Sequence, residues 1–222
     1  MDIPETAEEP CLDALLLQFE TECDNNLNVY FLSLQLYNEH SEIFSETMRN
    51  MMVEYVVLKL FGKWEKFLED IFIEYMLGGY SQCGDLVNRY VNPLDRDHAY
   101  RIIQNVNLYP DWSDVEKILT NARNFFENGG AFEILKTIKS EITSLKKIRN
   151  AIAHTSTRAQ KDFENLVRGK IGYLPEGISP AKFLIEFKTG RQRNDPTYCE
   201  FYISYLKNTA KLLVQYHRNE IE

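Results

Sequence analysis

The sequence predicts an all-α protein that forms a single domain over residues 1–222. Three observations support this fold class. Long stretches carry apolar residues at helical spacing, turn-forming residues fall between these stretches, and only residues 171–196 combine proline, glycine and alternating apolar residues. With 222 residues, of which 44% are apolar, the chain is long enough to bury one substantial core.

Two long helices are expected in the first third of the chain. Apolar residues at helical spacing predict an amphipathic helix within 11–40, which Asp24-Asn25-Asn26 interrupts or kinks. A second helix of about 30 residues begins after Ser45 and ends at the glycine pair Gly78-Gly79. Its density of large apolar side chains predicts that it is the central helix of the core.

Shorter helices are expected after this pair. Turn-forming residues divide positions 80–130 into two or three short helices, one of them capped by Ser113. Helical spacing returns from residue 131 to about residue 169, with a break near Thr155-Ser156-Thr157.

The C-terminal part departs from this pattern. Proline and glycine are too frequent in residues 171–196 for a continuous helix, so we expect a loop or a small β-hairpin inserted there. A last helix is predicted over 197–219.

Charge is distributed unevenly along the chain. The net charge of −8 argues against a protein that coats nucleic acid along its whole surface. Residues 1–76 hold sixteen acidic and four basic side chains, whereas residues 136–170 hold nine basic and three acidic ones. A polyanion is expected to be drawn to the second segment, and the alternative is two solvated faces of opposite sign.

Several protein classes are disfavoured. No run of about 18 apolar residues is free of charge, and MDIPETAEEP lacks the basic and apolar parts of a secretion signal. We therefore expect a cytoplasmic protein that does not bind membranes. The four cysteines are scattered without a histidine at zinc-ligand spacing, so neither a metal nor another cofactor is expected.

The residues with catalytic chemistry lie late in the helical stretch that begins at residue 131. Its core face is marked by apolar residues that step by 4, 3, 3 and 4, namely Ile138, Ile142, Leu145, Ile148 and Ile152. At about 100° per residue, His154 lies opposite this face and close to Asn150. A histidine there is expected outside the core, and the alternatives are a satisfied buried histidine or an inert surface one.

Arg149 lies at the edge of the same apolar face. An unpaired charge near a core costs several kcal/mol, so the guanidinium is expected to pair with a carboxylate of the second long helix. Glu65 is the first choice, ahead of Glu69 and Asp70. An ordinary buried ion pair is the alternative to a catalytic role, and the two are compatible.

The stretch Arg149-Asn150-Ala151-Ile152-Ala153-His154 resembles the R-x4-6-H motif of the HEPN superfamily, in the form in which asparagine follows the arginine. Residues 63–72 resemble the aromatic and glutamate-containing helix of the RiboL-PSP and related HEPN families. The resemblance covers about residues 47–79 and 131–158.

This resemblance implies an antiparallel helical bundle that forms a homodimer, with two copies of the motif facing one cleft. It implies a metal-independent endoribonuclease in which His154 takes the proton of the ribose 2′-OH and Arg149 holds the phosphate charge. Asn150 would orient the imidazole or form a hydrogen bond with the scissile phosphate. Glu65 would support Arg149. The basic residues expected to bind RNA are Lys146, Lys147 and Arg158.

The role expected of such an enzyme is that of a toxin or an antiviral defence effector, which an inhibiting or activating protein partner would control. The alternative is a catalytically silent HEPN dimer that serves as an RNA-binding or protein-interaction module.

Overall fold

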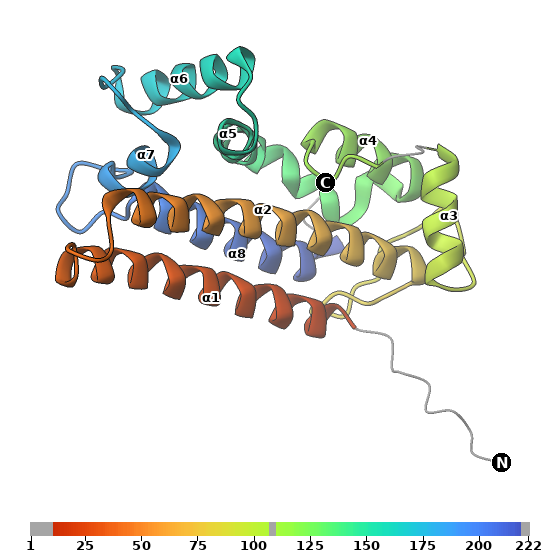
Figure 1. Cartoon of the computed structure of the whole chain (residues 1–222). Coiled ribbons are helices and arrows are strands. Elements are labelled where there is room, and N and C mark those ends of the chain that lie inside the picture. The colour runs from red at the N-terminus through yellow and green to blue at the C-terminus, as the bar shows by residue number, and fades with distance from the viewer. Residues whose placement is uncertain (1–10, 107–109, 219–222) are drawn as a thin grey trace.

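The computed structural model describes residues 11–106 and 110–218, and helices make up most of this part of the chain (Figure 1). It contains eight α-helices, one 3-10 helix, three isolated β-bridges and no strand in the described residues. The all-α prediction is therefore confirmed. The acidic residues 1–10 lie outside the described residues. The last helix, predicted over 197–219, ends earlier than expected, at Val214. In the described ranges, no helix is both long and apolar enough to cross a bilayer.

Two long antiparallel helices, α1 (Leu12–Glu39) and α2 (Glu46–Leu77), form the base of the bundle (Figure 1). The Ser45 hydroxyl accepts a hydrogen bond from the Met48 N–H and so begins α2. Gly78 ends it in the left-handed conformation, with φ of 94°. The predicted bounds of the central helix are confirmed.

Helix α1 runs without a break, so the interruption expected at Asp24-Asn25-Asn26 is absent. Asn26 is buried, and its side-chain amide donates to the Glu22 carbonyl oxygen at 2.8 Å. The amide is satisfied by its own helix and does not compete with the backbone hydrogen bonds.

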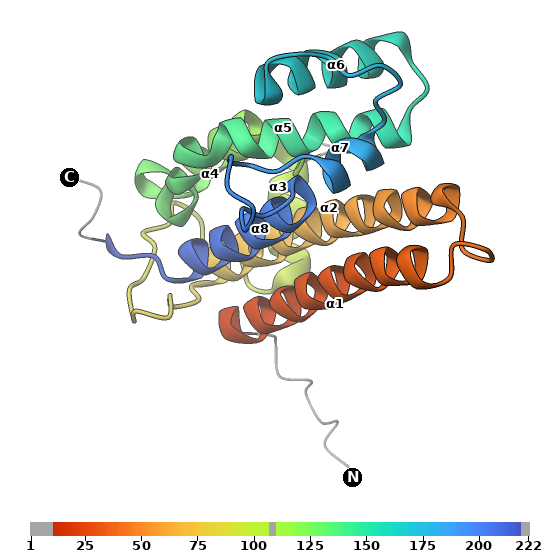
Figure 2. The same ribbon diagram turned by 90° about the vertical axis from the view of Figure 1, so that its left-hand side faces the viewer.

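The remaining elements are α3 (Arg96–Val106), α4 (Val115–Phe125), the 3-10 helix η1 (Glu127–Ile134), α5 (Leu135–Ala153), α6 (Thr157–Ile171), α7 (Pro180–Glu186) and α8 (Tyr198–Val214). Helix α8 packs against α1 and α2, α5 packs across α2, and α6 lies along α5 on the side away from α1 (Figure 2). Helix α2 is therefore central, as predicted, and α5 is held between α2 and α6.

Aromatic packing fixes this arrangement. Phe61, Trp64 and Phe72 of α2 are fully buried. The Phe72 ring lies 5.2 Å from that of Trp112 and 5.9 Å from that of Phe125, both in edge-on geometry. Such pairs are worth about 0.5–1.5 kcal/mol beyond the apolar area they bury. These contacts hold α4 and the residues just before it against the C-terminal half of α2. As a result, the start of α4 lies beside α5.

Two local predictions are wrong. The apolar run within 171–196 forms helix α7, capped by Ser179 with Pro180 in its first turn, and the expected β-hairpin is reduced to one bridge between Lys188 and Thr197. The neighbouring residues Phe183 and Leu184 are both buried, which a strand with alternating faces does not allow unless both of its faces are covered.

The cap of α4 is also one residue away from its predicted position. The Asp114 carboxylate accepts from the Glu116 and Lys117 N–H groups, whereas the Ser113 hydroxyl donates to Asp111. A carboxylate at this position also complements the positive end of the helix dipole.

Candidate functional site

The motif lies where α5 ends. The core-facing residues of α5 are buried as predicted, except Ile152, which is partly buried at the end of the helix. The helix ends at Ala153, and His154 follows as its C-cap with an extended backbone, φ −131° and ψ 132°. The helical-wheel position predicted for His154 is therefore wrong. Its side chain nevertheless lies outside the core, because the chain turns away from α5 at this residue.

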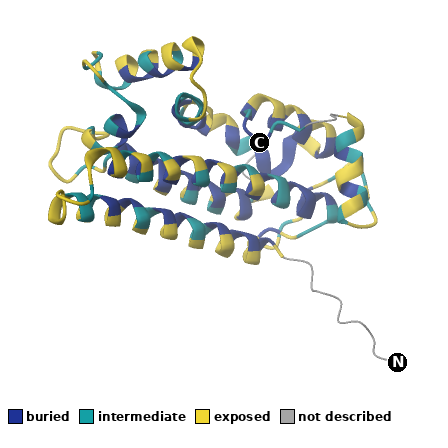
Figure 3. Ribbon diagram, viewed as in Figure 1, coloured by how far each residue is buried: buried dark blue, intermediate teal, exposed yellow. Residues whose placement is uncertain are grey.

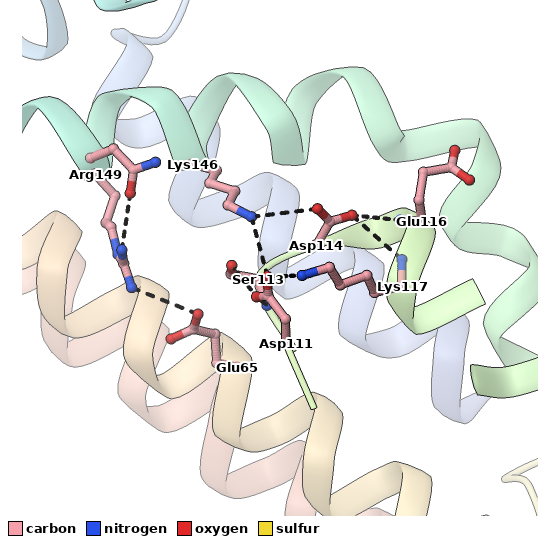
Figure 4. Close-up of polar contacts among 9 residues, drawn as sticks. Glu65, Asp111, Ser113, Asp114, Glu116, Lys117, Lys146 and Arg149 are labelled. Atoms are coloured by element: carbon pink, nitrogen blue, oxygen red, sulfur yellow. Dashed lines mark hydrogen bonds and ion pairs between the residues drawn. The ribbon is translucent and has the colours of Figure 1, made fainter. Parts of the chain in front are cut away.

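Arg149 is held by three neighbours. Its Nη2 lies 3.8 Å from Glu65 Oε1 on α2, its Nη1 donates to Asn150 Oδ1 at 2.9 Å, and its Cζ lies 5.3 Å from the centroid of the Phe61 ring (Figure 4). The predicted pairing with Glu65 is confirmed. Phe61, which the sequence analysis did not single out, adds a cation–π contact. These contacts restrain a guanidinium that is 28% exposed.

Glu65 has an unusual environment for a carboxylate. Burial raises its pKa above the ordinary value, the positive charges of Arg149 and Lys146 oppose this shift, and the negative charge of Asp111 adds to it. Glu65 therefore lies close enough to both basic residues for their charges to favour its ionised form. The ion pair fixes where the Arg149 charge is presented.

A second polar network lies beside the first, at the start of α4. Lys146 Nζ lies 3.9 Å from Asp111 Oδ2 and 3.8 Å from Asp114 Oδ2, and Lys117 Nζ donates to Asp111 Oδ2 at 3.1 Å (Figure 4). Burial favours the neutral form of Asp111, but hydrogen bonds from Ser113 and Lys117 outweigh it and lower the pKa. Sequence reasoning missed this network, since nothing local to Lys146 indicates that α4 begins next to it.

The basic residues predicted to bind RNA have different environments. Lys146 faces two carboxylates, and Lys147 is partly buried and makes no ion pair within the described residues. Arg158, on α6, is 93% exposed and reaches Asp162 only at 3.9 Å. Of the three, Arg158 is the most accessible to a ligand.

Arg149, Asn150 and Glu65 form one cluster, whereas His154 is separate from it. The His154 N–H donates to the Asn150 carbonyl oxygen at 2.9 Å, and its exposed side chain makes no hydrogen bond or ion pair with the described residues. Asn150 thus contacts Arg149 through its side chain and His154 through its backbone. A single chain holds the arginine in place and leaves the imidazole free to meet a ligand.

No group of three or more histidine, cysteine, aspartate or glutamate side chains is arranged to hold a metal ion in the described ranges. The chemistry available at the motif is that of an imidazole, a guanidinium and an amide.

Comparison with known proteins identifies the family. The model of the RiboL-PSP-HEPN family matches residues 25–174, a span that includes Glu65 and the whole motif. The chain belongs to the RiboL-PSP-HEPN family. Neither the curated proteins nor the solved structures contain a match to this chain. Membership of this HEPN family agrees with a role as a ribonuclease or in nucleotide binding.

Proposed function

We propose that this RiboL-PSP-HEPN protein is a metal-independent endoribonuclease. The observation that carries the proposal is the junction of α5 and α6, where an exposed His154 follows an Arg149 whose guanidinium is restrained by Glu65, Asn150 and Phe61. A proton-transfer group and a fixed cation are the two groups that RNA cleavage by internal transfer requires.

In the proposed reaction, His154 takes the proton of the ribose 2′-OH. The 2′ oxygen then forms a bond to the phosphorus atom, and the bond from phosphorus to the 5′ oxygen breaks. Arg149 stabilises the charge on the phosphate oxygens, and the leaving 5′ oxygen takes up a proton. The products are a 2′,3′-cyclic phosphate and a 5′-hydroxyl, and DNA is not a substrate because it lacks the 2′-OH.

The active form in this proposal is a homodimer. Helix α2 carries an exposed apolar stripe at spacings of 3, 4 and 3, formed by Met48, Met51, Tyr55 and Leu58 with exposed fractions of 38–64%. The same spacing continues through Gly62, beside which an added side chain would meet nothing, to Glu65. The stripe therefore leads along α2 to the carboxylate that holds Arg149.

A second copy of the chain is the occupant that best fits this stripe. An isologous contact brings the same surface of both copies together, so a dimer formed on α2 would also bring the two motifs toward one another. The small side chains of Ala151 and Ala153 leave room for that approach. Within one chain, His154 is separate from the Arg149 cluster. In a shared cleft, the Arg149 of the second copy would bind the phosphate next to His154.

The proposed role is that of a toxin or antiviral defence effector acting on cellular or invading RNA, and an inhibiting or activating protein partner would restrain it. The competing proposal is a silent HEPN dimer that binds RNA or protein. What favours that alternative is the position of the Arg149 guanidinium, whose contacts are already satisfied within the chain. Both proposals predict a dimer, so cleavage must decide between them.

The decisive experiment incubates purified protein with a mixed RNA pool in EDTA. Wild type is compared with His154→Ala, and His40→Ala is the matched control, because His40 is also an exposed C-cap histidine, at the end of α1. We expect wild type and His40→Ala to leave 2′,3′-cyclic phosphate ends and His154→Ala to leave the RNA intact. Equal cleavage by His154→Ala, or RNA left intact by wild type, would refute the ribonuclease proposal.

A further inference from the structure

Helix α6 stands apart from the rest of the bundle. It begins at Thr157, three residues after His154, and packs mainly along α5, so that its other side faces away from the protein (Figures 1 and 2). Figure 3 shows this outer side as mostly exposed. An RNA strand that is bound at His154 and continues past the end of α5 would therefore meet α6.

The outer side of α6 carries a row of cations. Arg158, Lys161, Asn165 and Arg168 follow one another at spacings of 3, 4 and 3, and all four are exposed. At about 100° per residue they fall within an arc of about 80°, opposite the buried side of the helix. That buried side consists of Ala159, Phe163, Leu166 and Val167. We call the four exposed residues the α6 row.

The cations of the α6 row are less neutralised by ion pairs than most lysines and arginines elsewhere in the described residues. Lys161 has no carboxylate within 4 Å in the described residues, Arg168 bonds only the neutral Asn165, and Arg158 is 3.9 Å from Asp162. In contrast, Lys170 lies on the side of α6 nearer α5 and binds both oxygens of Glu141 at 2.7 Å.

Two unpaired cations and a third with one long ion pair, all on the same side of a helix, need an explanation beyond solubility in a protein of net charge −8. Residues 147–193 contain ten basic and four acidic side chains, whereas residues 1–76 would repel a polyanion. The row from Arg158 to Arg168 spans about 15 Å, the length of about four phosphates of a stacked strand. The exposed ring of Tyr173 follows directly after the Gly172 cap and offers a surface on which a base can stack.

We infer that the α6 row binds the phosphates of a single RNA strand next to the cleavage site. This inference rests on the proposed ribonuclease function and adds to it the path of the substrate. RNA cut at His154 continues along the outer side of α6, held by charge and not by base sequence.

The test measures binding of single-stranded RNA of about 20 nucleotides to the full chain in the His154→Ala background, where the RNA stays intact. The test variant carries Arg158→Gln, Lys161→Gln and Arg168→Gln. The matched control carries Lys188→Gln, Arg191→Gln and Arg193→Gln, which remove the same charge from three exposed cations that form no ion pair in the described residues.

We expect the test variant to bind RNA about 10- to 100-fold more weakly than its parent at about 0.1 M salt, and the slope of log affinity against log salt to become shallower by about 2. The loop variant should keep most of the affinity and slope. An unchanged slope in the test variant, an equal loss in the loop variant, or no RNA binding by the parent would overturn the inference.

The test is separate from that of the ribonuclease proposal. In the wild-type background, the α6 substitutions should slow cleavage of the 20-nucleotide RNA more than cleavage of a dinucleoside monophosphate, which is too short to reach along α6. If wild type cuts neither RNA but the slope changes as expected, the α6 row stands and the enzyme proposal fails. If wild type cuts both RNAs but the α6 substitutions change neither RNA binding nor cleavage, the ribonuclease proposal is supported and the inference about the α6 row fails.

Discussion

At the scale of single residues, Arg149 and His154 differ in what they contribute to the fold. Arg149→Ala removes an ion pair, a hydrogen bond and an aromatic contact and leaves Glu65 without its partner. We expect the free energy of unfolding to fall by about 1 kcal/mol or somewhat more. The exposed His154→Ala should change it by less than about 0.5 kcal/mol. Urea unfolding of both variants checks this, and equal stability of the two would contradict it.

The Glu65 carboxyl gives the protein a defined pH dependence. Because burial raises its folded-state pKa above 4.5, the protonated form is favoured by folding. Its contribution to stability is present below the unfolded pKa and is lost as the pH rises through the folded pKa. The stability of wild type relative to Glu65→Gln should therefore fall as the pH rises above about 4.3, the ordinary pKa of a glutamate in an unfolded chain.

Glu22 is the control of opposite sign. A hydrogen bond from Lys63 lowers its pKa despite partial desolvation. Its contribution is present above the unfolded pKa and is lost as the pH falls through the folded pKa. The stability of wild type relative to Glu22→Gln should therefore rise as the pH approaches about 4.3 from below and stay level above it, in the same urea titrations. Parallel pH profiles for the two variants would show that the environment of Glu65 is not as described.

At the scale of elements, two glycines of α2 should respond oppositely to alanine. Gly78 has φ of 94°, and an added Cβ would meet the Arg89 guanidinium, which donates to the Met76 carbonyl oxygen. Gly62 is helical and exposed, with nothing within 4 Å of an added Cβ. We expect Gly78→Ala to destabilise by about 1 kcal/mol or more, and Gly62→Ala to stabilise by about 0.5–1 kcal/mol. Thermal unfolding of the two variants at low protein concentration measures both effects.

At the scale of the whole molecule, the proposed homodimer rests on the exposed apolar stripe of α2. A charge placed at Met51 would have to be buried in the proposed dimer, which is costly without a partner. Met51→Glu should therefore shift the protein to monomers and abolish RNA cleavage. Leu17→Glu is the matched control, because Leu17 lies on α1 with an exposed fraction of 65% against 64% for Met51.

Light scattering of both variants gives their mass in solution. A mixture of Met51→Glu with wild type adds a further check, since a monomeric variant should not lower wild-type activity. A Met51→Glu protein that remains a dimer would place the interface elsewhere. A Met51→Glu monomer that cleaves RNA at full rate would show that the site is complete in one chain.

The sequence alone determined the features that depend on local interactions. Helix α2 could be bounded because the Ser45 cap and the left-handed Gly78 act within one turn of the chain. The pairing of Arg149 with Glu65 could be predicted because a charge at the edge of an apolar stripe needs a partner and α2 was expected to be the central helix of the core. The family resemblance was confirmed over residues 25–174.

Only the tertiary structure decided the features that depend on contacts between distant segments. The apolar run in α7 is too short for its spacing to distinguish helix from strand, and burial of Phe183 and Leu184 settled it. Lys146 could have faced RNA or carboxylates, and the packing of α4 beside α5 placed Asp111 and Asp114 near it. His154 left the helix because α5 ends at Ala153, and the break predicted near Thr155-Ser156-Thr157 locates a helix end only to within one or two residues.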